Sequence, residues 1–174
     1  MKRTAARILC LLMCAMALLA PVSALAAEEQ SAPNVIELMK TYTQLDLTPY
    51  EGKAIYLNFF TEWCYYCMQE MPDIKTMYET YDPEELQIVL VHVWDGEDAS
   101  NTESVKKAHG LEELTFFEDK DGMVASLVGL QGYPASLYVN KDGTLAAGYN
   151  YALSLEQLCA PLDAMGVARR ADAQ

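Results

Sequence analysis

Basic residues are scarce in this sequence, and their scarcity limits the partners that its net charge could attract. Lysine and arginine together number 12, against 25 aspartates and glutamates, so the formal net charge is −13 at pH 7. A chain this acidic does not bind nucleic acid through its overall field, because the phosphate backbone is itself negative. The composition excludes that class of protein and otherwise indicates only solubility.

Long hydrophobic runs are also few, and the clearest one lies at the N-terminus. Residues 8–20 carry no charge and follow the basic start Met1–Arg7. The run is too short to cross a bilayer comfortably, and Ala24 and Ala26 are small residues where a signal peptidase needs them. We therefore expect residues 1–26 to be a signal peptide that is cleaved on export. An uncleaved signal anchor is the alternative, because the apolar stretch could extend to Ala26.

Cysteine is sparse as well, with five residues in the whole chain. Cys10 and Cys14 would leave with the signal peptide, so the exported chain keeps Cys64, Cys67 and Cys159. An odd number of thiols at this density is not the pattern of a small secreted protein held together by disulfides. One close pair with a leftover thiol indicates redox chemistry. We expect Cys159 to be a small core residue of the last helix.

The exported chain is long enough for a single domain, at about 148 residues. We expect residues 27–47 to form a tether and the first elements, and residues 48–166 to form the domain. Residues 167–174 should be a flexible tail.

The middle of the chain predicts a β-α-β unit. Residues 54–60 and 86–93 are near-continuous apolar runs, typical of parallel strands buried on both faces. Residues 65–81 carry apolar side chains at helical spacing between them. Further helices are expected at residues 102–109 and 123–128, and a last one from Ser154 to near Gly166. Residues 135–140 and 144–149 should form a hairpin around Asp142-Gly143.

Cys64 and Cys67 lie where the first predicted strand passes into the helix. The unpaired N–H groups of the first helical turn would face the sulfur of Cys64, and Cys67 follows one turn later on the same face. The helix dipole contributes at most about 2 kcal/mol, or roughly 1.5 pKa units, to the thiolate. This arrangement predicts that Cys64 attacks a substrate disulfide and that Cys67 resolves the mixed disulfide.

Three alternatives to redox exchange remain open at this point. A zinc site would need about four ligands, but His92 and His109 lie near no second cysteine pair. A purely structural disulfide over this short spacing would constrain the unfolded chain very little. Thr61 and Cys64 match the Thr-x-x-Cys of peroxide-reducing enzymes, but Leu57 stands where those enzymes carry a proline.

Taken together, the motifs resemble the thioredoxin superfamily, and within it the TlpA/ResA-type extracytoplasmic thiol-disulfide oxidoreductases. The resemblance covers about Thr48 to Met165. Its markers are Gly52-Lys53, the stretch from Asn58 to Cys67, Glu70-Met71-Pro72, Gly129 to Pro134 and the turn from Asn140 to Gly143. It implies an α/β fold of the thioredoxin-like three-layer type, a central mixed β-sheet with helices on both faces. It also implies dithiol-disulfide exchange with no cofactor beyond the cysteine pair.

The resemblance assigns roles to two further residues. Pro134 matches the family's cis-proline, which lies beside the cysteine pair and exposes the preceding backbone to a substrate strand. Glu70 matches an acidic residue that accepts the proton of Cys67, although an ordinary solvated helix glutamate is the alternative. Asn58 stands where cytoplasmic thioredoxins have a buried aspartate, which favours Glu70 as the proton acceptor.

Aromatic residues around the pair are expected to bind substrate, together with Pro134. They are Trp63, Tyr65, Tyr66 and Tyr133. Tyr65 and Tyr66 depart from most relatives, which carry a proline just before the second cysteine. Two aromatic faces beside the nucleophile would favour an apolar stretch of an unfolded or extended substrate.

The expected function is exported thiol-disulfide exchange with protein thiols and disulfides, in the reducing direction. A membrane protein would supply or accept the electrons, and the protein itself should be a monomer that binds no nucleic acid and no metal. Two other functions stay open. A non-catalytic binding or chaperone module would not need Cys64, and a copper-handling protein would need His92 within ligand distance of the sulfurs.

Overall fold

The computed structural model describes residues 33–94 and 102–171. The predicted signal peptide lies outside these residues, as do most of the expected tether and the end of the tail. In the part of the chain that is described, no helix is both long and apolar enough to cross a membrane.

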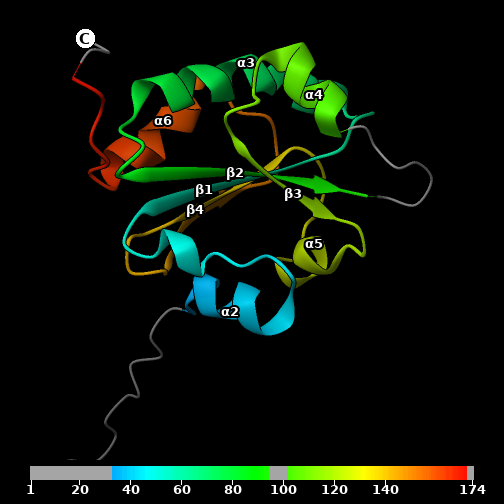
Figure 1. Cartoon of the computed structure of the whole chain (residues 1–174), viewed down its shortest axis with the longest axis horizontal. Coiled ribbons are helices and arrows are strands. Elements are labelled where there is room, and N and C mark those ends of the chain that lie inside the picture. Colours follow the sequence, from blue (N-terminus) through cyan, green and yellow to red (C-terminus); the bar gives the residue numbers. More distant parts are fainter. Residues whose placement is uncertain (1–32, 95–101, 172–174) are drawn as a thin grey trace, which may run out of the picture. The chain divides into compact units, whose positions relative to one another are not determined.

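A five-stranded mixed sheet forms the centre of the fold (Figure 1). The strands are β1 (Ala54–Phe60), β2 (Leu86–Val93), β3 (Thr115–Asp119), β4 (Ala135–Val139) and β5 (Leu145–Tyr149), in the spatial order β3-β2-β1-β4-β5. Strands β1, β2 and β3 are parallel, whereas β4 is antiparallel to both β1 and β5. The predicted pairing of the first two strands and the predicted hairpin are confirmed.

Helices cover both faces of the sheet, which confirms the predicted three-layer fold. Figure 1 shows α3 (Tyr65–Thr80), α4 (Thr102–His109) and α6 (Leu155–Ala164) on one face, and α2 (Val35–Tyr42) and α5 (Met123–Leu127) on the other. A short 3₁₀ helix, η2 (Thr48–Tyr50), precedes β1.

The central strand β1 separates two hydrophobic cores because its side chains alternate between the two faces. All seven of its residues are buried. Tyr56 and Phe60 pack in the core beneath α3 and α6, and Leu57 and Phe59 pack in the core beneath α2 and α5. Because β1 is packed on both faces, it is a rigid support for the start of α3, which follows it in the chain.

Strand β3, helix α2 and the short η2 were not individually predicted from the sequence. Strand β3 is a short edge strand, and four of its five residues are only half-buried, so it has no clear apolar pattern. Helix α2 begins at the end of the expected tether and is capped by Asn34, whose side chain accepts the N–H of Glu37. It buries Val35, Ile36 and Met39 against the sheet.

The expectation of a flexible tail is wrong for residues 167–171. Val167 is buried, and the carbonyl of Ala168 accepts the N–H of Asp82 at 2.9 Å. Arg169 pairs with Tyr81 in an isolated β-bridge, and the N–H of Arg170 donates to the carbonyl of Thr80 at 2.9 Å. These backbone bonds to the end of α3 hold the segment in place.

Candidate redox site at the start of helix α3

The cysteine pair forms a disulfide at the first turn of α3. The Cα atoms of Cys64 and Cys67 lie 5.2 Å apart. Cys64 is the N-cap residue, and its Sγ accepts the backbone N–H of Cys67 at 3.1 Å. Both residues are buried, with exposed fractions of 5% for Cys64 and 0% for Cys67. Sγ of Cys64 therefore faces the N–H groups at the start of α3, which have no partner within the helix.

The local sequence explains this placement. Strand β1 ends at Phe60, and the N–H of Cys64 donates to the carbonyl of Thr61 at 3.3 Å, which closes the turn into the helix. The first turn of α3 contains no acidic residue, although the chain as a whole is strongly acidic. Nothing in that turn opposes the positive end of the helix dipole, which favours a thiolate at Cys64.

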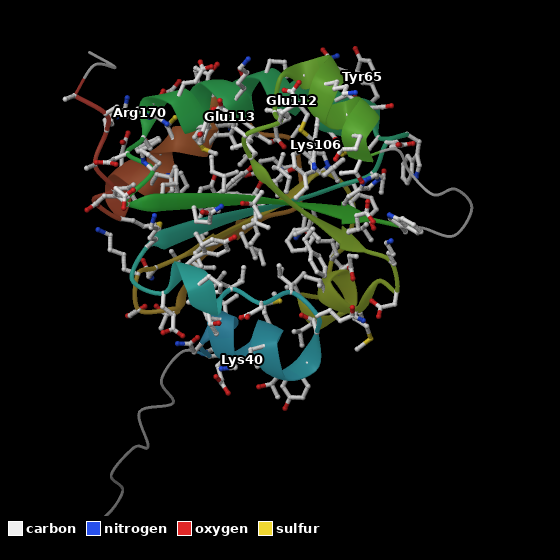
Figure 2. The ribbon with its side chains drawn as sticks, viewed as in Figure 1. Lys40, Tyr65, Lys106, Glu112, Glu113 and Arg170 are labelled. Carbon is white, nitrogen blue, oxygen red and sulfur yellow. A yellow bond between two sulfur atoms is a disulfide. The ribbon has the colours of Figure 1, made fainter. Side chains whose placement is uncertain are left out.

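Exposed aromatic side chains surround the buried disulfide. Trp63, Tyr65 and Tyr66 are 66%, 68% and 64% exposed. Figure 2 shows Tyr65 at the outer surface of the helical layer. The rings of Tyr65 and Tyr66 meet edge to face with centroids 5.5 Å apart. Large exposed rings beside a reactive group are suited to apolar contact with another molecule.

The segment before β4 reaches the same surface. The Tyr133-Pro134 peptide bond is cis, as the resemblance implied. The ring of Tyr133 lies edge to face against Trp63, with centroids 6.0 Å apart. This contact places the cis-proline segment next to the turn that carries Cys64. A shallow groove continues from Tyr133 between Gly129–Gly132 and α5.

Glu70 lies inside the protein rather than on its surface. It is 2% exposed, so the alternative of a solvated helix glutamate is excluded. Its Oε1 accepts the backbone N–H of Leu153 at 2.7 Å, and its Oε2 accepts Nδ2 of Asn58 at 2.9 Å. Burial raises the pKa of Glu70, the two hydrogen bonds act in the opposite direction, and nearby Asp73 raises the pKa further. Its position one turn after Cys67 on α3 suits a proton acceptor.

Asn58 connects Glu70 to two buried hydroxyl groups. Its Nδ2 also donates to the Tyr56 hydroxyl at 3.1 Å and to Oγ of Ser136 at 3.5 Å, and these two hydroxyls lie 2.9 Å apart. The sequence pattern did not identify Tyr56 or Ser136 as neighbours of Glu70. Because Tyr56 and Asn58 are two residues apart on one strand, their side chains lie on the same face of the sheet. This spacing could have identified Tyr56 as a neighbour of Asn58.

His92 belongs to a separate buried cluster beneath α4. Its ring stacks on Phe60 with centroids 4.6 Å apart, and Nδ1 lies 3.1 Å from Oγ1 of Thr102. Thr102 in turn donates to Glu118 at 2.9 Å. Over residues 33–94 and 102–171, no group of three or more His, Cys, Asp or Glu side chains is placed to hold a metal ion.

Cys159 is a core residue of α6, as predicted. It is 8% exposed, forms no disulfide and packs in the core beneath α3 and α6. Burial raises the pKa of its thiol, which lowers its reactivity.

Comparison with known proteins agrees with this geometry. The AhpC/TSA family model matches residues 29–147. Thiol-disulfide oxidoreductase ResA of Geobacillus thermodenitrificans is 32% identical over 97 residues, which is 56% of this chain and 54% of that relative. The chain therefore spans about half the length of that relative. Sporulation thiol-disulfide oxidoreductase A of Bacillus subtilis is 28% identical over 141 residues, which is 79% of this chain and 84% of the relative.

Solved structures show the same fold. A secreted Mycobacterium tuberculosis disulfide oxidoreductase, homologous to Escherichia coli DsbE, has a TM-score of 0.60 at 24% identity, covering 69% of this chain and 87% of that one. StoA of Bacillus subtilis has a TM-score of 0.57 at 23% identity, covering 66% and 85%. The thioredoxin-like fold implied by the resemblance is confirmed. Because the family match spans the cysteine pair, Glu70 and the cis-proline together, this chain belongs to the AhpC/TSA family of thioredoxin-like proteins.

Proposed function

We propose that this protein is an exported thiol-disulfide oxidoreductase that reduces disulfides in other proteins through Cys64 and Cys67. The observation that carries the proposal is a disulfide at the start of a helix, with a buried carboxyl one turn further along that helix. The relatives that share the sequence pattern are named thiol-disulfide oxidoreductases.

The reaction starts from the reduced pair. The Cys64 thiolate attacks one sulfur of the substrate disulfide, a mixed disulfide forms and the first substrate thiolate leaves. Cys67 passes its proton to Glu70 and attacks Sγ of Cys64, which releases the second substrate thiolate. The protein is left with the Cys64–Cys67 disulfide, and the substrate has gained two electrons and, from Glu70 and solvent, two protons. Glu70, buried one turn after Cys67 on α3, accepts the proton in this step and returns it in the reverse step, so it assists exchange in both directions.

Substrate binding is assigned to the surface around the pair. By the family resemblance, the backbone before Pro134 is the segment that pairs with a substrate strand, and the ring of Trp63 packs edge to face on the ring of Tyr133. Tyr65 and Tyr66, which lie between the two cysteines in the chain, add exposed ring surface. This combination suits an apolar, extended segment around the substrate cysteine.

The cellular setting follows from the N-terminal pattern. A signal peptide at residues 1–26 places the protein outside the cytoplasm, where a membrane donor has to return electrons to the oxidised pair. The reaction needs no cofactor beyond that pair, and a monomer is sufficient.

The first test is the reduction potential of the pair. The mature Cys159→Ala variant leaves Cys64 and Cys67 as its only thiols, so alkylation after equilibration with glutathione or dithiothreitol reports on them alone. A potential at or below about −220 mV supports a reductase, whereas a value near about −120 mV indicates an oxidant. A pair that stays in one state across the accessible range would contradict exchange altogether.

A trapping experiment tests the roles of the two cysteines separately. Cys67→Ser should accumulate a mixed disulfide with a peptide disulfide, because the resolving thiol is missing. Cys64→Ser should form no adduct and show no turnover. If Cys64→Ser kept the activity, the chain would be a binding or chaperone module instead.

A further inference from the structure

We propose that the side chain of Asn58 changes from hydrogen-bond donor to hydrogen-bond acceptor when Glu70 takes up the proton of Cys67. Asn58 is then a positioning residue that serves Glu70 in both protonation states. This inference rests on the proposed function, because it describes how the proton acceptor of that reaction is held.

The hydrogen bonds around Glu70 fit only its ionised form. Both partners of the carboxyl, the Leu153 N–H at 2.7 Å and the Asn58 Nδ2 at 2.9 Å, are donors. A carboxylate accepts both bonds, but a protonated carboxyl also needs an acceptor for its own O–H. At 2% exposure, a carboxyl without that acceptor would carry the cost of an unsatisfied buried group.

Asn58 is the partner that can provide an acceptor. A backbone N–H such as that of Leu153 only donates, whereas turning the Asn58 amide by about 180° exchanges Nδ2 for Oδ1. Oδ1 of Asn58 is buried and has no hydrogen-bond partner within residues 33–94 and 102–171. The turn therefore breaks no existing bond of that oxygen, and it exchanges the bonds that Nδ2 donates to Glu70, Tyr56 and Ser136 for an acceptor that faces the proton on Glu70.

The hydroxyl neighbours of Asn58 permit either orientation. The Tyr56 hydroxyl lies 3.1 Å from Nδ2 and 2.9 Å from Oγ of Ser136, and either hydroxyl can be the donor in that pair. While Glu70 is ionised, Tyr56 accepts from Nδ2 of Asn58 and donates to Ser136. After the turn, Ser136 donates to Tyr56, and Tyr56 donates to Oδ1 of Asn58.

The other titratable groups that face Glu70 do not replace this role. Tyr56 from β1 and Tyr138 from β4 are buried, and burial raises the pKa of each hydroxyl well above its usual range, with Glu70 adding to both shifts. Both tyrosines therefore stay neutral when Glu70 titrates. Asp73, on the same helix, opposes negative charge on Glu70 and raises its pKa. None of these groups offers a countercharge to the carboxylate, which leaves Asn58 as the adjustable partner.

NMR spectroscopy of the reduced, mature protein tests the turn directly. The carboxyl carbon of Glu70 is titrated while cross-peaks are followed from the Asn58 amide protons to the Tyr56 ring and the Ser136 β-protons. We expect these cross-peaks above the titration midpoint and their loss below it. Glu70→Gln imitates the protonated carboxyl, because its amide donates toward Asn58, so the cross-peaks should be missing at every pH. Cross-peaks that persist through the titration, or in Glu70→Gln, would overturn the inference.

A kinetic test separates this inference from the proposed function. Asn58→Leu has similar size and can neither donate nor accept, so its mixed disulfide should resolve at least tenfold more slowly at pH 7, while attack by Cys64 keeps its rate. Asn150→Leu, at an exposed asparagine after β5, is the matched control and should change neither step. If Asn58→Leu resolves at the wild-type rate, the inference fails and the exchange reaction stands. If the wild-type protein shows no exchange, the proposed function itself fails.

Discussion

Replacing Glu70 by glutamine should make the folded protein more stable at neutral pH, and the gain should disappear in acid. The carboxyl is 2% exposed and hydrogen-bonded at 2.7 and 2.9 Å. Burial nevertheless raises its pKa above the ordinary value of 4.5, which means that loss of water outweighs the two bonds. Glutamine keeps the shape and one acceptor oxygen but carries no charge to bury.

The sign of the effect follows from proton linkage. A carboxyl whose pKa is higher in the folded than in the unfolded protein keeps its full stability below the unfolded pKa. That stability is lost as the pH rises through the folded pKa. Each unit of separation between the two pKa values corresponds to about 1.4 kcal/mol. We therefore expect the stability of Glu70→Gln relative to wild type to increase between pH 4 and pH 8. For a domain of this size, each kcal/mol of that increase changes the difference between the two Tm values by about 2–4 °C.

Thermal and urea unfolding of both oxidised proteins, followed by circular dichroism at several pH values, measures this difference. Other carboxyls also make the stability of the protein depend on pH. Hydrogen bonds from Arg169 and Lys120 lower the pKa values of Asp163 and Glu118 respectively, so the contribution of these two carboxyls to stability is lost in acid. That loss is the same in both proteins and cancels in the comparison. A difference that stays flat from pH 4 to pH 8, or that shrinks as the pH rises, would refute the reasoning.

Three further substitutions test the support of the site. Tyr81→Phe removes a buried hydroxyl that donates to Asp163 at 2.7 Å and to the carbonyl of Cys159 at 3.1 Å, and should cost about 1–3 kcal/mol in urea unfolding. Asp119→Ala removes the acceptor of two N–H groups at the start of α5, at 3.1 and 2.9 Å, and should lower stability by about 1–2 kcal/mol. Cys159→Ala should leave the disulfide-exchange rate unchanged, because the thiol it removes is buried in the core.

The sequence predicted most of the framework because its elements have clear periods and ends. Leu86–Val93 and Thr102–His109 have the bounds expected from their apolar pattern and from the flanking Pro83 and Gly110. The position of Cys64 between a strand and a helix followed from the same change of period. Local patterns are strong where an element is buried on both faces or capped by a turn residue.

What could not be predicted depends on contacts between distant parts of the chain. The burial of Glu70 involves the N–H of Leu153, which is 83 residues away, and no spacing in α3 indicates it. The order in residues 167–171 depends on backbone bonds to the end of α3, although their composition resembles a solvated tail. The cis bond before Pro134 came only from the family resemblance, because about 5–6% of such bonds are cis.

The burial of Glu70 affects how well it can act as the proton acceptor proposed for Cys67. A general base works best when its pKa approaches that of the acid it serves. A carboxyl with its ordinary pKa of 4.5 is far below a thiol with an ordinary pKa of about 8.5. Burial moves the pKa of Glu70 upward, toward the thiol, whereas the same glutamate on an exposed helix face would keep its low pKa and remain a weak base. The hydrogen bonds from Asn58 and Leu153 satisfy the buried carboxylate and so offset part of the cost of burying its charge. They therefore allow an ionised Glu70 at a position where burial makes it a stronger base.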